Sequence, residues 1–494
     1  MVPGSLVSAR DRVHDAAFLF PAALSRVGVV DRERGEEAFD LALPVMVTGA
    51  IRTLLRTADF FMVSLALSSA AVAGLEFAFQ YFFIGFGLAL ALSSGTISVV
   101  SRLHGAGDHA RARLAVKQSL WLAALTAAPL MIGAFLYADG LIGLLTDDPA
   151  VIEQGATYLR IVMGALFFRF VSIVSARAFQ GAGDTRTPMY VNLLTVPTNI
   201  LLNAVLIFGL GPAPSLGIAG AAWGTAIANT LSASIFTYLL VSDRTRVGVS
   251  LEGPQWDTTL ATEIVRVGSP LAGSRLVQTL GRFPFLYILA SLGTPVVAAY
   301  AIGRRVIMLA LMPAWGYSTA SSTLVGQSIG AGDTDDATLY GWSTLRIALA
   351  TQLLIAAVLI VLAGPIAAVF NTEPIGLTVE FIRVFGLAVG GFSIGRTMQG
   401  ALRGAGDTTW PLYGKILGLA VRLSVAVLAL DAATTFEVAG IALSPGLGLG
   451  LLAVYVAILA DFYLQAGINT VRFRGGKWQA VARRAEENRG AAGD

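Results

Sequence analysis

Three charged residues, Arg52, Arg56 and Asp59, interrupt an apolar segment at residues 41–67. Their spacing of four and then three positions puts them on one face of a helix. A carboxylate at membrane depth is costly unless it is paired, protonated or hydrated, so this acid is a candidate for binding an ion or a substrate. Arg56 could instead neutralise Asp59 as a structural ion pair. The segment by itself leaves both interpretations open.

The composition predicts an integral membrane protein without a catalytic centre. Hydrophobic residues make up 55% and charged residues 13% of the 494 residues, with a mean hydropathy of +0.72. In soluble domains, roughly 45–50% of the residues are apolar and about 25% are charged. The absence of cysteine excludes disulfides and thiolate chemistry. We expect His14, His104 and His109, which fall in polar connections, to be solvated, and we expect no metal, cofactor or nucleic acid. No paired acids or nucleophile–base group occurs in the apolar segments, which argues against an enzyme.

The charged residues lie on apolar segments that are long enough to cross a membrane, which takes about 20 residues. Twelve can be counted, and they predict an all-α integral membrane fold of two pseudo-symmetric six-helix lobes. The predicted spans are 41–67, 76–101, 115–137, 155–178, 189–209, 217–241, 264–290, 296–326, 341–363, 377–401, 411–430 and 436–468. The predicted organisation is an N-terminal cytoplasmic or interfacial segment (1–40), an N-lobe (41–241), a cytoplasmic linker (242–262), a C-lobe (263–469) and a basic cytoplasmic tail (470–494).

The loop charges predict that both termini are cytoplasmic. Connections after even-numbered spans hold or adjoin Arg102, Arg111, Arg113, Lys117, Arg177, Arg186, Arg244, Arg246, Arg403 and Lys415. The opposite connections hold acids but no Lys or Arg, as in Asp139–Glu153. Because positive residues concentrate on the cytoplasmic side, the even-numbered connections are assigned to it.

The tetrapeptide Gly-Ala-Gly-Asp occurs four times, at 105–108, 181–184, 330–333 and 404–407. Each copy follows the cytoplasmic end of an even-numbered span, and the second half of the chain repeats the first in the same orientation. The repeat lacks the lysine and hydroxyl residue of a phosphate-binding loop. We expect a structural role instead, in which glycine ends one helix in a left-handed conformation and the following Asp or Thr caps the next helix.

These segments together resemble the multidrug and toxic compound extrusion (MATE) family. The resemblance rests on RAFQGAGDTRTPMYVNLL at 177–194, its echo QGALRGAGDTTWPLYGKIL at 399–417, the stretch 297–333 and the opening 41–63, and it runs from about 41 to 469. It implies an exporter with two six-helix lobes that exchanges protons or sodium ions for amphipathic, often cationic compounds.

The resemblance also implies roles for particular residues. The branch resembled most, with archaeal and DNA-damage-inducible members, uses an acid on the first span, which Asp59 matches. It pairs that acid with an Asn and an Asp on the fifth span, where this chain has Asn199 and Asn203, so a like charge near Asp59 is missing. A sixth-span threonine corresponds to Thr225. A second branch places acids in the C-lobe, where this chain has Gln278 and Phe392, which favours ion coupling in the N-lobe.

Further residues are candidates for lining a substrate cavity. On the second span, Glu76 and Gln80 share a face with Phe79 and Phe83, although such an aromatic stripe is more often ordinary packing. Pro44 removes a backbone hydrogen bond and marks a candidate helix bend, unless it lies in the first helical turn, where proline costs nothing. The cavity candidates beside Arg52 and Arg56 are Glu76, Gln80, Arg275, Gln278 and Arg282.

The sequence therefore predicts a secondary active multidrug exporter that works by alternating access, with H⁺ or Na⁺ as coupling ion. We expect it to be a monomer in the plasma membrane, with small amphipathic organic substrates. The alternative is a flippase of a lipid-linked or anionic lipid substrate, because Arg275, Arg282 and other arginines lie inside C-lobe spans. The two differ in whether transport depends on Asp59 or on the arginines.

Overall fold

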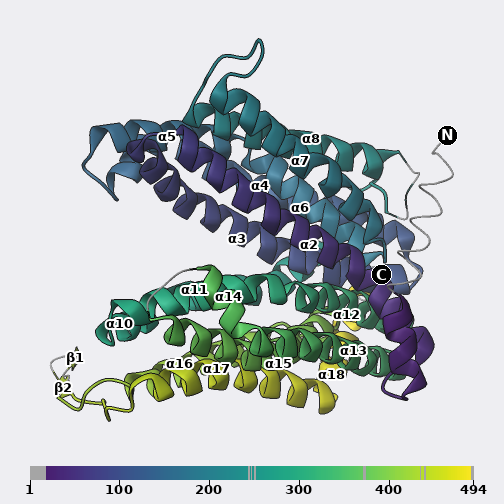
Figure 1. The fold of residues 1–494 in the computed structure, drawn as a ribbon. Coiled ribbons are helices and arrows are strands. Elements are labelled where there is room, and N and C mark those ends of the chain that lie inside the picture. The colour runs from purple at the N-terminus through teal and green to yellow at the C-terminus, as the bar shows by residue number, and fades with distance from the viewer. Residues whose placement is uncertain are drawn as a thin grey trace. The chain divides into compact units, whose positions relative to one another are not determined.

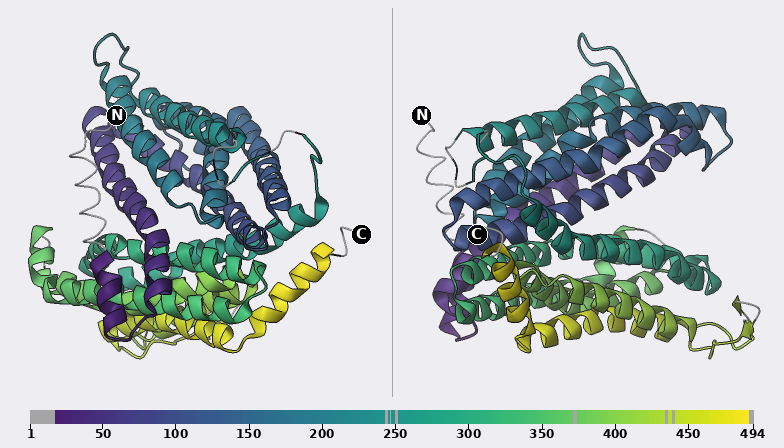
Figure 2. Two further views of the ribbon diagram at one scale, coloured as in Figure 1. Left: turned by 90° about the vertical axis from the view of Figure 1, so that its right-hand side faces the viewer. Right: turned by 180° about the vertical axis from the view of Figure 1, so that it is seen from behind.

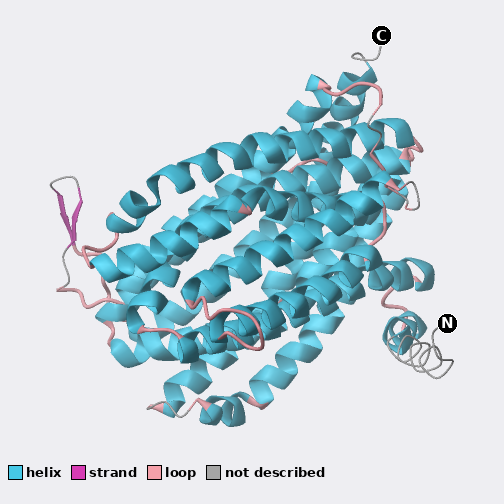
Figure 3. Ribbon diagram, turned by 90° about the horizontal axis from the view of Figure 1, so that it is seen from above, coloured by secondary structure: helices cyan, strands magenta, loops and turns pink. Residues whose placement is uncertain are grey.

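The computed structural model describes residues 18–490, except 243–244, 246, 250–251, 371–373, 434–435 and 439–440. The side chains of 55–61, 64–66, 436–438, 441–443, 486 and 488–490 also lie outside the described part. The described chain is almost entirely helical, as Figure 3 shows. Two three-residue strands, β1 (Phe436–Val438) and β2 (Ile441–Leu443), form an antiparallel hairpin.

The helices follow one another with short connections (Figure 1). In the first half they are α2 (Arg32–Ala66), α3 (Ser69–Gly105), α4 (His109–Gly143), α5 (Pro149–Gly164), α6 (Leu166–Gly181), α7 (Arg186–Phe208) and α8 (Ile218–Val241). In the second half they are α9 (Thr258–Leu280), α10 (Arg282–Ser291), α11 (Thr294–Ala310), α12 (Met312–Gly330), α13 (Thr334–Val361), α14 (Ala363–Val369), α15 (Ile375–Gly404), α16 (Thr409–Val427), α17 (Gly450–Arg474) and α18 (Lys477–Gly490).

Among the described residues, eight helices are long and apolar enough to cross a membrane, or up to ten if two bent pairs each count as one span. The bent pairs are α5 with α6, at 46°, and α11 with α12, at 45°. The two remaining predicted spans, 41–67 and 264–290, correspond to α2 and to α9 with α10, which carry more charge. The predicted all-α membrane architecture is confirmed.

The last predicted span, 436–468, begins too early. The structure places the β1–β2 hairpin at its start, and α17 begins only at Gly450. Pro445 lacks a backbone donor, and Gly448 and Gly450 have φ angles of +68° and +56°. A helix cannot run through residues in these conformations, although their apolar neighbours resemble a span in hydropathy.

The chain forms two compact units. Unit 1 comprises Met1–Met46, Gly273–Ser328 and Asp333–Arg483; unit 2 comprises Val47–Ala272, Ile329–Gly332 and Arg484–Asp494. The chain passes from one unit to the other inside α2 and again inside α9. The first turns of α2 therefore belong with the second half of the sequence, and those of α9 belong with the first half.

In unit 1, the first part of α2 packs against α12 and α13. Phe39 and Leu41 share a buried cluster with Tyr317 and Ile347, and Arg34 forms an ion pair of 2.9 Å with Asp336. Figures 1 and 2 show α15 beside α17 and α13, and these helices with α11 and α16 build the larger core of the unit. Helix α2 begins at Arg32, so Pro44 lies in its interior and not in its first turn.

In unit 2, the first part of α9 packs closely against α3. A Cβ atom added to Gly95 would lie 2.1 Å from the carbonyl oxygen of Ile264, and one added to Gly268 would lie 2.6 Å from that of Ala91. Small residues allow helix backbones to approach in this way, and dispersion contacts hold such pairs together in a membrane. Buried residues of α3 to α6 and α8 complete the core of this unit.

The four Gly-Ala-Gly-Asp repeats end helices as predicted. The second glycine of each copy has a φ angle between +71° and +85°, at Gly107, Gly183, Gly332 and Gly406. The first three aspartates then accept a hydrogen bond from a backbone amide three residues later, at 2.8–2.9 Å. Asp407 differs, because it binds Arg472 of α17 at 2.7 Å. The fourth copy therefore ties the connection between α15 and α16 to α17 by an ion pair.

Candidate functional site

In unit 2 the structure brings together three of the residues expected at the coupling site. The Asn199 amide nitrogen lies 3.5 Å from Asn203 Oδ1, one turn along α7, and 3.4 Å from Thr225 Oγ1 on α8. Asn203 is only 1% exposed, whereas Asn199 and Thr225 are half-buried. At membrane depth, amide and hydroxyl groups can donate hydrogen bonds to a carboxylate, and their oxygen atoms can coordinate a cation. This group is therefore suited to binding an ion.

Two glycines of α8 give α7 the room to carry this group. A Cβ atom at Gly224 would lie 2.0 Å from Asn203 Oδ1, and one at Gly220 would lie 2.4 Å from the carbonyl oxygen of Leu206. The two glycines are one helical turn apart, so both face the same neighbour. The small residues of α8 thus determine where the Asn203 side chain sits.

Arg52 connects α2 to the same helix. Its Nη2 donates a hydrogen bond of 2.5 Å to Asn192 Oδ1, and the Asn192 amide donates one of 2.6 Å to the Pro188 carbonyl. Asn192 and Asn199 are seven residues apart on α7, as Arg52 and Asp59 are on α2. The side chains of Arg56 and Asp59 lie outside the described residues, although α2 is helical through both positions.

The other predicted N-lobe candidates stand apart from this group. Glu76 and Gln80 are exposed on α3. The ring of Phe79 instead packs edge-on against Tyr158 at 5.8 Å and against Phe82 at 6.3 Å. These contacts agree with the packing interpretation of the aromatic stripe.

Unit 1 contains a cluster of basic side chains that the sequence indicated only in part. Arg275 of α9 and Arg396 of α15 both lie against the indole of Trp315, with guanidinium carbons 5.7 and 4.1 Å from the ring centroid. Arg396 also contacts the Phe392 ring and donates a hydrogen bond of 3.0 Å to Gln399. Of the three C-lobe residues predicted to line a cavity, Arg275 belongs to this cluster, whereas Gln278 and Arg282 are exposed. Arg422, another arginine noted inside a C-lobe span, also belongs to it.

Helices α16 and α17 add two cations and one acid. Lys415 donates to Gln465 at 3.4 Å, and Gln465 donates to the buried Asp461. Arg422 lies 3.5 Å from the Asp461 carboxylate and donates to the Tyr300 hydroxyl at 3.1 Å. Lys415 interacts electrostatically with Asp461 and with all three arginines, Arg275, Arg396 and Arg422. We call Arg275, Arg396, Lys415, Arg422 and Asp461 the C-lobe charge cluster.

Sequence reasoning missed most of this cluster for a specific reason. It counted Lys415 with the residues that adjoin a cytoplasmic connection, but Lys415 lies two turns inside α16. It did not single out Arg396 or Asp461, although each is a charge inside an apolar segment, which is the signal that identified Asp59.

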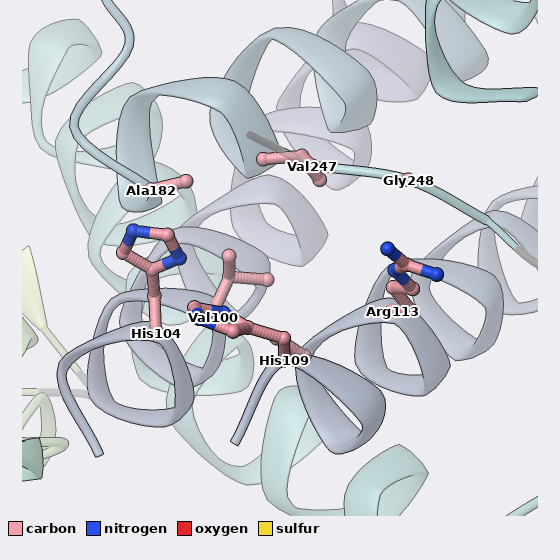
Figure 4. Close-up of a pocket in the computed structure, with 8 residues that line it drawn as sticks. Val100, His104, His109, Arg113, Ala182, Val247 and Gly248 are labelled. Carbon is pink, nitrogen blue, oxygen red and sulfur yellow. The ribbon is translucent and has the colours of Figure 1, made fainter. Parts of the chain in front are cut away.

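A pocket of about 380 Å³ lies where α3, α4 and α6 meet the segment after α8 in unit 2. Figure 4 shows His104, His109 and Arg113 around it, together with Val100, Ala182, Val247 and Gly248. The two imidazole rings are 5.2 Å apart. Within the described ranges, no group of three or more His, Cys, Asp or Glu residues could hold a metal ion.

Comparisons with known proteins assign the family. The MatE family profile matches residues 44–205 and 270–428. The chain is 30% identical over 456 residues to a probable multidrug resistance protein NorM of Thermotoga maritima, covering 90% of this chain and 94% of that protein. It is 25% identical to an FAD transporter of Shewanella oneidensis, over 71% of this chain and 77% of that protein.

Solved structures agree on the fold. A transporter of the MOP superfamily from Pyrococcus furiosus, described as having a binding pocket of reversed polarity that suggests a different function, superimposes with a TM-score of 0.79 at 22% identity, covering 91% of this chain and 96% of that one. The family profile matches each half of the chain once, in keeping with the internal repeat. The chain belongs to the MatE family of multi-pass membrane transporters.

Proposed function

We propose that this chain is a secondary active exporter of amphipathic small molecules, driven by H⁺ or Na⁺ through a site formed by Asp59, Asn199, Asn203 and Thr225. We further propose that the chain belongs to the archaeal and DNA-damage-inducible branch of the family. It would act as a monomer in the plasma membrane, with both termini in the cytoplasm. A relative described as a probable multidrug resistance protein supports the substrate class.

The hydrogen bond between Arg52 and Asn192 is the observation that carries the proposed coupling site. Helices α2 and α7 are the first and fifth spans, so the chain crosses the membrane in the same direction in both. Seven residues advance a helix by about 10 Å. In two helices that run side by side in the same direction, the same advance from the contact between Arg52 and Asn192 would bring position 59 toward the level of Asn199. The register therefore supports a site shared by Asp59, Asn199 and Thr225.

Such a site can couple ion movement to export. An ionised Asp59 attracts a cation or accepts hydrogen bonds from Asn199 and Thr225, whereas a protonated Asp59 donates one. The two forms thus favour different arrangements of α2, α7 and α8. A ligand shifts an equilibrium between two conformations only by its differential affinity for them. Binding of H⁺ or Na⁺ at Asp59 would supply that difference and drive alternating access.

The test is ethidium efflux from cells that express wild type, Asp59→Asn or Thr225→Val at matched membrane abundance. We expect Asp59→Asn to abolish efflux and Thr225→Val to reduce it, because each removes one partner of the ion. The control is Glu153→Gln, which neutralises an exposed acid on α5. The wild-type dependence on pH or on sodium identifies the ion. Full efflux by Asp59→Asn would refute coupling at this site.

A second candidate function is movement of an anionic compound, including the anionic or lipid-linked substrate of a flippase. The observation that favours it is the C-lobe charge cluster, which contains four cations and one acid. A relative described as an FAD transporter also carries an anionic molecule. Transport that requires Arg275 and Arg396 but not Asp59 would favour this function over cation-driven export of cationic drugs.

A further inference from the structure

We propose that the C-lobe charge cluster is a binding site for the anionic group of an aromatic amphiphile, and that Asp461 is a built-in competitor for that anion. The proposal rests on the second candidate function, movement of an anionic compound, and names the chemical class of that compound. It concerns unit 1 alone, because all members of the cluster belong to that unit.

The first argument is the imbalance of charge. Arg275, Arg396, Lys415 and Arg422 come from α9, α15 and α16, and Asp461 of α17 is the one acid among the described residues that forms an ion pair with any of them. Within the described part of the chain, three positive charges are therefore left without an ion-pair partner. Unmatched charge inside a membrane protein is costly, and basic side chains there typically pair with an acid or mark the path of a substrate.

The second argument is the set of unused donors. The Arg275 guanidinium stacks on Trp315 and forms no hydrogen bond or ion pair with the described residues. Arg422 Nε is buried without a hydrogen-bond partner. A guanidinium has five N–H donors in a planar fork that fits carboxylate or phosphate oxygens. Arg275 and Arg422 are each partly exposed as whole residues, the Arg422 side chain to 20%.

The third argument is the aromatic surface beside the cations. Arg396 is 4.1 Å from the Trp315 centroid and 5.2 Å from that of Phe392, and both rings are half-buried. Stacking on these rings holds the guanidinium without using its edge donors. The rings also provide an apolar surface for a flat ligand. A molecule with an anionic group and an aromatic ring matches both features.

Asp461 is placed to oppose this ligand. Its carboxylate is 4% exposed, contacts Arg422 and Gln465, and interacts with Lys415. A Cβ atom at Gly418 would lie 2.6 Å from Asp461 Oδ1, so the glycine of α16 leaves the space that this carboxylate fills. The acid therefore satisfies part of the cluster in the absence of ligand. Removing its charge should strengthen anion binding, whereas removing a cation should weaken it.

The experiment measures equilibrium binding of flavin mononucleotide, and of uncharged riboflavin with the same ring system, to the purified full chain in phosphatidylcholine nanodiscs. We expect the mononucleotide to bind more tightly. Arg396→Gln and Arg275→Gln should each weaken its binding about 10-fold, the effect of one lost charge-assisted hydrogen bond. Asp461→Asn should strengthen it. The matched control is Arg383→Gln, an exposed arginine on the same helix as Arg396.

Equal affinity for the two flavins, or equal losses in Arg383→Gln and Arg396→Gln, would overturn the proposal. The two arginine variants carry the test by themselves if Asp461→Asn does not fold. Adding phosphatidylglycerol to the nanodiscs distinguishes two sources of the anion: competition with the mononucleotide identifies a lipid headgroup, and its absence identifies a soluble ligand. Binding needs no transport, so retained binding with no ethidium efflux would refute the proposed exporter and leave this site intact.

Discussion

Gly224→Ala tests whether the close approach of α8 to α7 maintains the polar group of the N-lobe. The new methyl group would lie 2.0 Å from Asn203 Oδ1 and 3.0 Å from the Asn203 backbone nitrogen. The side chain must therefore move, and α7 cannot stay in place without strain. The variant should distort the group while leaving every polar residue of it chemically intact.

The expected destabilisation is the sum of two costs, reduced by one gain in helix stability. Overpacking costs about 1–3 kcal/mol, and losing the contact between Asn199 and Asn203 costs about 0.5–1.5 kcal/mol. Alanine is more favourable than glycine in a helix by about 1 kcal/mol. The net loss of stability should thus be about 0.5–3.5 kcal/mol. We also expect weaker ethidium efflux, because Asn203 no longer supports Asn199.

The assays are thermal unfolding of the purified protein and efflux at matched expression. Gly87→Ala is the matched control: Gly87 is also in a helix of unit 2, and its added Cβ would meet no atom within 4 Å. We expect that control to be neutral or slightly stabilising. The reasoning fails if Gly224→Ala unfolds and transports like Gly87→Ala.

The remaining predictions concern stability. Glu263→Gln removes the carboxylate that lies 2.9 Å from Arg102, whose side chain is 1% exposed. The buried charge left on Arg102 should lower the free energy of unfolding by about 3–5 kcal/mol. An unchanged melting temperature would contradict this. Gly332→Ala should cost about 1–2 kcal/mol, because φ is +81° and no atom crowds the site. Gly364→Ala, also uncrowded but within α14, should show no such loss in the same thermal unfolding measurement. Equal melting temperatures for these two glycine variants would exclude backbone strain at Gly332.

The sequence by itself determined the features that depend on composition and on neighbours along the chain. Apolar length identified the spans, and the repeated Gly-Ala-Gly-Asp tetrapeptide identified the helix ends, since a left-handed glycine followed by an N-terminal cap needs only a few consecutive residues. The four-residue spacing of Asn199 and Asn203 likewise puts both on one face of a helix, and the structure places them 3.5 Å apart on α7.

Only the tertiary structure decided which distant residues share an environment. No local pattern indicates that Arg34 meets Asp336 or that the early turns of α2 pack in unit 1. Arg396 and Asp461 each occur as single charges in separate spans, and their common cluster arises only when α15, α16 and α17 pack together. Hydropathy reports how apolar a segment is but not which way a side chain faces. The partner of a charge is therefore set by helix packing across long sequence separations.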